Sequence, residues 1–402
     1  MSFLRFGYVS GPIIGALWLF VLSTTVSITM SFATGDPFRP SLWASLFCGV
    51  ILGGVATTAN AMPMKAGVIG AVVFILTLVG FGPIVMETSA FNGVVAALIL
   101  AAAMGGSMAK IMDKCPMGPL TRHEMEEVWI RFLTGFGYIF FTAIVLIPFY
   151  VMVMTSLKSQ AALLQNPLDF SLDIDKGWAL FRSYQELFRD FNFGTYMWTS
   201  FYVSVLTVLI TLAFSVPGAY AVARLQFKGR AAFSRSILLI YMVPMIVLAL
   251  PIYIAFSVTG LRNTILGIVL IYPVTTIPVA LYMLQGYFRG LPAEVEEAGL
   301  MDGLNRLQVI WKITLPLALP ALASVSLYVF MIAWNEFLLA FMLLDDPSIF
   351  TLTRGVAMLN SSEIPREHLM AGAVIATIPV MVLFLGLEKF MTKGLTAGSV
   401  KG

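Results

Sequence analysis

Long apolar runs separated by short polar stretches make up most of the chain. A transmembrane helix needs about 20 apolar residues. Ten runs approach or exceed that length, near residues 11–33, 42–60, 66–86, 90–111, 132–156, 197–222, 237–258, 266–288, 317–344 and 370–390. A membrane β-barrel would need segments of alternating hydrophobicity, which these continuous runs lack. The pattern therefore predicts an all-α, polytopic membrane protein with about ten transmembrane helices.

Composition and charge agree with a membrane location and suggest an orientation. Hydrophobic residues make up 59% of the chain and charged residues 11%, whereas soluble domains average about 45–50% and about 25%. With the N-terminus in the cytoplasm, 16 Lys and Arg residues fall inside and 8 outside, four of the latter in the long loop 157–196. Long loops cross largely regardless of charge. We therefore expect a multi-pass protein of the bacterial plasma (inner) membrane with both termini in the cytoplasm.

The first four runs differ in character from the other six. They are rich in Gly and Ala, and Gly11 and Gly15, like Gly49 and Gly53, stand four residues apart. Such spacing lets helices approach closely, either within this block, which we favour, or across a dimer interface. The run 11–33 is long for a cleaved signal peptide and is expected to span. We expect a four-helix membrane extension of unknown role (1–112), a cytoplasmic linker (113–131) and a six-helix core (132–402).

Catalytic and metal-binding motifs are absent from the sequence. The only histidines, His123 and His368, fall on opposite sides of the predicted membrane, and the stretch HEMEE lacks the second His of a zinc-binding helix. Neither a GxSxG motif nor a phosphate-binding GxxxxGK[ST] loop occurs. The basic residues form no patch typical of nucleic-acid binding. We expect a non-catalytic chain with no metal site and no cofactor of its own.

One ionisable residue, Glu336, lies well inside a predicted span, in the stretch WNEF (334–337). A charge at the membrane centre costs at least about 2.5–3.5 kcal/mol, so its side chain should face protein or water. Asn335 and Glu336 could line a solute path. Alternatively, the Glu336 carboxylate could be tied to a neighbouring helix or lie near the outer interface, and the sequence leaves both possibilities open.

The stretch EEAGLMDGLNRLQVIWKITLP (296–316) is unusual because it is charged and structured between two apolar runs. Pro292 suits the first turn of a helix, and acidic residues near a helix N-terminus are favoured by the macrodipole. Gly303 permits a reversal before a second short helix. We therefore predict a cytoplasmic helix–turn–helix that docks into a basic groove of another protein. An amphipathic loop on the lipid surface is the alternative, disfavoured because anionic lipids attract basic residues.

The pattern EAGLMDG, nine residues, then ITLP resembles the EAA loop of ABC-importer permeases. The match comprises Glu297, Ala298, Gly303, Ile313, Leu315 and Pro316, while Gly299 replaces the usual Ala. The stretches 147–158 (IPFYVMVMTSLK) and 334–337 resemble the first and fifth core helices of sugar-importer permeases, and 394–402 (GLTAGSVKG) is similar to the C-terminus of the second permease subunit of maltose importers. The resemblance covers about residues 130–402 and leaves 1–125 unassigned.

The resemblance implies a permease subunit that forms half of a translocation pore with a second permease subunit. Separate ATPase subunits, using ATP and Mg²⁺, would bind the loop 291–316, a solute-binding protein would contact the loop 345–369, and the tail 394–402 would reach between the ATPase subunits. Membrane lipid completes the list of partners. The residues that the resemblance implies in ATPase coupling are Glu296, Glu297, Ala298, Gly299, Asp302, Gly303, Ile313, Leu315 and Pro316.

The expected cargo is a carbohydrate, and the sequence does not name it. A permease of the same architecture for a polyol, glycerol phosphate or osmolyte is the first alternative. A secondary transporter is a weaker alternative, because inverted repeats and several buried charges would favour it and we see neither in the sequence. We expect the extension to be dispensable for translocation.

Overall fold

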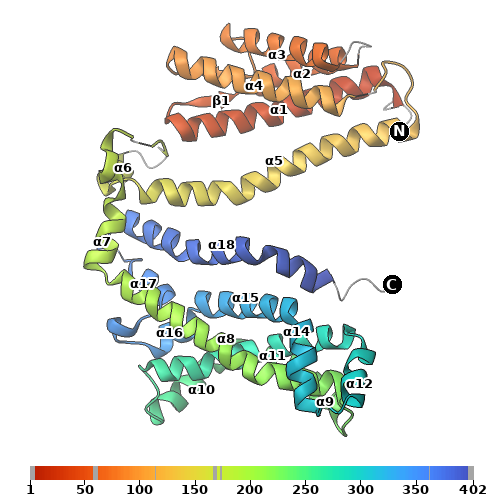
Figure 1. Ribbon diagram of the computed structural model, residues 1–402. Coiled ribbons are helices and arrows are strands. Elements are labelled where there is room, and N and C mark those ends of the chain that lie inside the picture. The colour runs from red at the N-terminus through yellow and green to blue at the C-terminus, as the bar shows by residue number, and fades with distance from the viewer. Residues whose placement is uncertain are drawn as a thin grey trace. The chain divides into compact units, whose positions relative to one another are not determined.

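The computed structural model describes residues 5–57, 62–113, 115–165, 170–172, 174–361 and 363–396. The described elements are helices apart from two three-residue strands, β1 (Phe38–Pro40) and β2 (Ile84–Met86), which pair antiparallel. This confirms the all-α fold (Figure 1). The chain divides into two compact units, residues 1–180 and 181–402.

Unit 1 contains helices α1 to α6, three of which begin at a side-chain cap. Ser41, Ser89 and Thr121 each accept a hydrogen bond from a backbone N–H of the following turn, which satisfies a donor that the helix leaves unpaired. Because Thr121 starts α5, the second half of the stretch 113–131 is helical rather than extended linker. The helices are α1 (Gly7–Thr34), α2 (Leu42–Ala56), α3 (Met62–Leu78), α4 (Ala90–Ile111), α5 (Arg122–Ser156) and α6 (Gln160–Gln165), followed by the 3-10 helix η2 (Ile174–Phe181).

The paired glycines of α1 and α2 face one another. A Cβ atom on Gly53 would lie 2.1 Å from the carbonyl oxygen of Gly11, and one on Gly15 would lie 2.3 Å from that of Gly49. No side chain fits at such separations, so the two backbones pack directly together. The structure thus confirms close packing within the extension, and these glycines are not free to form a dimer interface.

Unit 2 is built on α8, which packs against α11 and α15, while α15 also packs against α18 (Figure 1). Within this core, the hydroxyls of Thr211 in α8 and Thr276 in α11 are 2.6 Å apart, which satisfies both in an apolar environment. The longer helices are α7 (Arg182–Asp190), α8 (Phe193–Arg224), α9 (Arg230–Tyr241), α10 (Met245–Val258), α11 (Ile265–Gly290), α12 (Ala293–Met301), α15 (Leu319–Asn335) and α18 (Arg366–Thr396). The shorter ones are α13 (Arg306–Val309), η3 (Ile310–Thr314), α14 (Leu315–Leu317), α16 (Leu338–Leu343), η4 (Pro347–Ile349) and α17 (Leu352–Met358).

Six helices in the described part of the chain are long and apolar enough to span, or seven if the bent pair 306–317 and 319–335 counts as one span. This differs from the ten predicted runs because α2, α3 and α10 have only 15, 17 and 14 residues. The run 237–258 is interrupted before α10, whose N-cap is Pro244; proline has no N–H to continue a helix. The run 317–344 is interrupted at Glu336.

Candidate functional site

The predicted helix–turn–helix is present in the charged stretch. Pro292 precedes α12, which carries Glu294 and Glu296 in its first turn. Gly303 has a φ of 87°, in the left-handed region that glycine adopts without steric cost. Asn305 then caps α13 by accepting from the backbone N–H of Gln308 (2.9 Å), while its own backbone N–H donates to the Gln308 side chain (2.8 Å). Local sequence therefore specifies both the end of α12 and the start of α13.

Glu296 lies on the inward face of α12 and is almost completely buried. Its carboxylate accepts hydrogen bonds from the hydroxyls of Thr314 (3.0 Å) and Tyr220 (3.2 Å). The guanidinium of Arg224 lies 3.4 Å away, within ion-pair distance although not in hydrogen-bonding geometry. Arg224 also donates to the carbonyl of Leu291, just before α12 (2.7 Å). This buried network fixes the loop 291–316 to the end of α8.

Gly299 is buried against the loop itself. A Cβ atom there would meet the Cδ1 atom of Ile313 at 2.4 Å. The small residue thus lets the Ile313 side chain pack against α12. The tip of a flexible side chain can move, so an alanine at this position would require only that Ile313 shift.

Other residues predicted to couple to an ATPase lie on the outward face of α12 and at the turn that follows it. Glu297 and Ala298 are exposed, as are Asp302 and Gly303 at the turn. Met301 at the end of α12 is 88% exposed, and Trp311 in η3 is 71% exposed. Sequence reasoning did not single out either residue. Adjacent residues of one helix therefore differ: Glu296 contacts its own chain, whereas Glu297 is available to a partner.

The remaining predicted coupling residues lie between these two faces. Ile313 and Leu315 are half-buried, and Pro316 in α14 is exposed. Thr314 between them is buried with Glu296. Sequence reasoning missed the partners Tyr220 and Arg224, because no local pattern links the end of α8 to a loop more than 70 residues further along the chain. It also missed Thr314, which lies in the loop itself, 18 residues after Glu296.

Glu336 ends α15 and caps the next helix. Its carboxylate oxygens accept from the backbone N–H groups of Leu339 (2.9 Å) and Ala340 (3.1 Å) at the start of α16. These contacts favour the structural alternative for Glu336 because they supply the hydrogen bonds that a membrane-buried carboxylate needs. Asn335 is exposed and donates to the carbonyl of Met331 (2.9 Å), so a role in a solute path remains a prediction.

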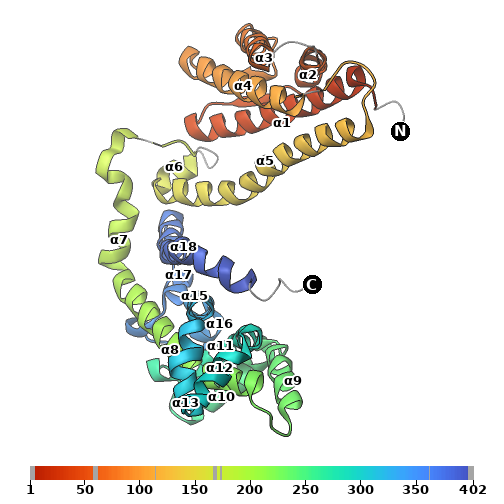
Figure 2. The same cartoon turned by 45° about the vertical axis from the view of Figure 1, so that its right-hand side comes forward.

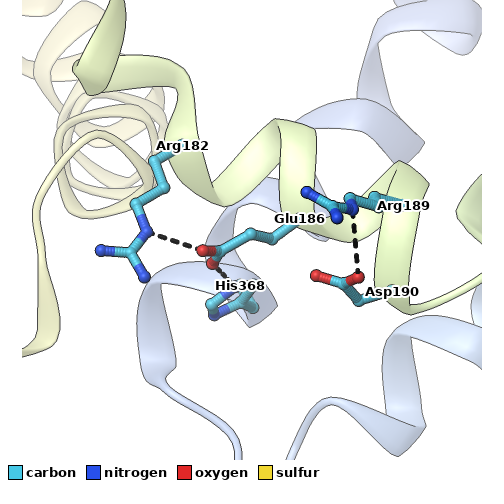
Figure 3. Close-up of polar contacts among 5 residues, drawn as sticks. All are labelled: Arg182, Glu186, Arg189, Asp190 and His368. Atoms are coloured by element: carbon cyan, nitrogen blue, oxygen red, sulfur yellow. Dashed lines mark hydrogen bonds and ion pairs between the residues drawn. The ribbon is translucent and has the colours of Figure 1, made fainter.

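A second polar cluster joins α7 to α18 (Figure 3). The Glu186 carboxylate accepts from Arg182 (2.6 Å) and lies 2.8 Å from Nε2 of His368. The Arg182 hydrogen bond lowers the pKa of Glu186; the contact with His368 acts in the same direction, and burial opposes both. The neighbouring Arg189 and Asp190 lie 3.9 Å apart. This cluster ties together two elements far apart in the sequence.

Known proteins are similar in sequence to the part of the chain that contains the loop 291–316. The family model described as "Binding-protein-dependent transport system inner membrane component" matches residues 215–396. The inner membrane ABC transporter permease protein YcjP of Escherichia coli (strain K12) is 37% identical over 270 residues, which is 66% of this chain and 95% of that relative. The trehalose/maltose transport system permease protein MalG of Thermococcus litoralis is 34% identical over 282 residues, 69% of this chain and 99% of the relative.

The fold agrees with these sequence relations. A chain from the crystal structure of a bacterial ABC transporter involved in the import of the acidic polysaccharide alginate matches with a TM-score of 0.56 and 26% identity. The match covers 67% of this chain and 98% of that one. The chain therefore belongs to the family of binding-protein-dependent transport system inner membrane components, the permease subunits of ABC importers.

Proposed function

We propose that this chain forms half of the translocation path of a carbohydrate importer and is driven by separate ATPase subunits that use ATP and Mg²⁺. The carbohydrate is supported by the relative that transports trehalose or maltose and by the structural neighbour that takes part in alginate import. The chain itself contributes contacts and a path rather than catalysis. A second permease subunit completes the pore in this proposal.

The observation that carries the proposal is the two-sided construction of α12. Its inward face is held by the buried pair of Glu296 and Arg224, and its outward face presents the exposed Glu297. Because a buried ion pair connects α12 to the core, a displacement of α12 by a docked subunit would also displace α8. Under the predicted orientation this face lies in the cytoplasm, where ATP is available.

The opposite end of unit 2 suits contact with a solute-binding protein. In the loop 345–369, Asp345 pairs with Arg262, and the backbone N–H groups of Asp345 and Asp346 donate to the Asn263 side chain (2.8 and 2.9 Å). These contacts hold the start of the loop to the turn before α11. The proposed tail contact rests on residues 394–402, of which 397–402 lie outside the described residues.

The test compares Glu297→Ala with Glu294→Ala in the complete importer. Both side chains are exposed on α12, but only Glu297 matches the family pattern. If the Glu297 pair is desolvated on docking, its loss costs about 2–5 kcal/mol of binding; an exposed pair loses about 1 kcal/mol or less. Copurification of the ATPase and uptake of a labelled disaccharide should therefore fall together in Glu297→Ala and change little in Glu294→Ala.

Two results would contradict this assignment. Equal effects of the two substitutions would remove the special role of Glu297. Loss of uptake with the ATPase still bound would show that Glu297 transmits motion rather than anchoring the partner. In addition, the purified chain alone in liposomes supplied with ATP should move no sugar; transport without partner subunits would refute the proposal as a whole.

A further inference from the structure

A basic pocket lies beside α9, a helix at the same end of unit 2 as α12 (Figure 2). Its volume is about 540 Å³, and it is formed by the turn between α8 and α9, the first turns of α9 and the end of α11. Arg230, Arg235 and Arg289 line it together with the hydroxyl-bearing Ser234 and the ring of Phe227. Three arginines and a serine therefore line one pocket.

Two of the arginines are held in place by neighbouring groups. Arg230 donates to the carbonyls of Val222 (2.6 Å) and Ala223 (3.0 Å) at the end of α8. With the amide of the buried Gln285 oriented so that both of its polar atoms are satisfied, Arg289 donates to its oxygen (2.6 Å) and its nitrogen donates to Ser234 (3.1 Å). Fixed donors lose little conformational entropy when a ligand binds, so the pocket is preorganised for an acceptor.

The positive charge of the pocket is not neutralised within the described part of the chain. The ion pairs found among the described residues include none that involves Arg230, Arg235 or Arg289. Their hydrogen bonds go to neutral carbonyl and amide oxygens, which leave the full charge in place. A guanidinium group can donate two parallel hydrogen bonds to two oxygens of one phosphate, a bidentate arrangement. The pocket thus suits a phosphate.

An exposed apolar surface, formed by the end of α9 and by α10, lies next to the pocket. α9 runs from the pocket toward Leu239 and Met242, which are exposed, and α10 continues with the exposed Ile246 and Leu250. Only Ala249 is fully buried among the residues of α10. In a membrane protein, an apolar surface of this kind is covered by acyl chains or by another subunit. The pocket is therefore a cationic site at one end of an exposed apolar helix pair.

We propose that this pocket binds the phosphate of an anionic phospholipid whose acyl chains lie along α9 and α10. A lipid matches both parts of the surface, because its charged headgroup and its apolar tails are joined in the same order as the pocket and the helix pair. A free phosphate would use only the pocket. An acidic segment of a partner protein would not require the apolar surface beyond it. Basic pockets between transmembrane helices are known to bind anionic headgroups.

The test measures lipid binding to the purified full-length chain in a neutral detergent by native mass spectrometry. The chain is titrated with dioleoylphosphatidylglycerol or with the zwitterionic dioleoylphosphatidylcholine. The variant Arg235→Gln/Arg289→Gln removes two exposed charges of the pocket and leaves the structural Arg230 in place. The matched control, Lys110→Gln/Lys312→Gln, removes two exposed charges outside the pocket on the same predicted side of the membrane.

We expect the wild type to prefer phosphatidylglycerol, and the pocket variant to bind it about thirtyfold more weakly. The control should keep the preference, and unchanged elution and melting without lipid should show that both variants fold. The proposal fails if the pocket variant keeps its preference or if the control loses as much affinity. It also fails if inorganic phosphate or glycerol phosphate competes as well as the whole lipid, since the site would then bind a free anion.

Discussion

Replacing Glu296 by alanine should release the docking loop from the core. The substitution leaves the Arg224 guanidinium without its carboxylate in a place where the two side chains are only 6% and 13% exposed. Water therefore cannot take over the lost interaction. Removing one partner of a buried ion pair typically costs about 3–5 kcal/mol. The hydroxyls of Tyr220 and Thr314 lose their acceptor as well, which places the expected cost toward the upper end of that range.

Hydrogen exchange of the α12 backbone measures this cost directly. The network holds one loop, so its loss should favour local opening rather than unfolding of the whole unit. An opening free energy lowered by about 3–5 kcal/mol speeds exchange between a hundredfold and several thousandfold. Glu297→Ala is the matched control, since its exposed carboxylate should change stability by no more than about 0.5 kcal/mol.

A double substitution separates the buried charge from other effects. Glu296→Ala with Arg224→Leu removes both charges, and part of the lost protection should return because no unpaired charge stays buried. Recovery will be incomplete, since Arg224 also holds the carbonyl of Leu291. Exchange in Glu296→Ala that is no faster than in Glu297→Ala would refute the reasoning, because the ion pair would then contribute nothing to holding the loop.

Three further predictions concern other parts of the chain. Gly53→Leu should destabilise unit 1 by at least about 3 kcal/mol, because its Cβ would lie 2.1 Å from the carbonyl oxygen of Gly11; a normal melting curve would contradict this. The lowered pKa of Glu186, caused mainly by Arg182, adds stability that is present above the ordinary carboxyl pKa and lost as pH falls through the folded value. The melting advantage of the wild type over Glu186→Gln should thus decline as the pH is lowered below the ordinary carboxyl pKa; an advantage that does not decline on acidification argues against this cause. A chain that starts at Thr121 should keep sugar uptake if it inserts, and loss of uptake with normal assembly would show that the extension is needed.

The helix–turn–helix at 292–309 could be predicted from the sequence because its signals are local. Pro292 precedes α12 and the positive φ of Gly303 follows it, and each depends only on the residue itself and its nearest neighbours. The apolar runs likewise specified helices, because a chain in lipid must satisfy its backbone hydrogen bonds within each segment. The spacing of Gly11 and Gly15 indicated a close contact between helices but did not indicate which helix is the partner.

Tertiary structure decided the features that depend on distant residues. Glu296 and Glu297 are neighbours with the same side chain, yet only the first is buried, because Arg224 and Tyr220 at the end of α8 lie on that side of α12. The sequence could not choose between them, since a helix turns each successive residue to a different direction and the core determines which direction is inward. Glu336 shows the same limit: its apolar surroundings indicate a continuous span, but its carboxylate accepts the backbone N–H groups of the next helix and the span ends there.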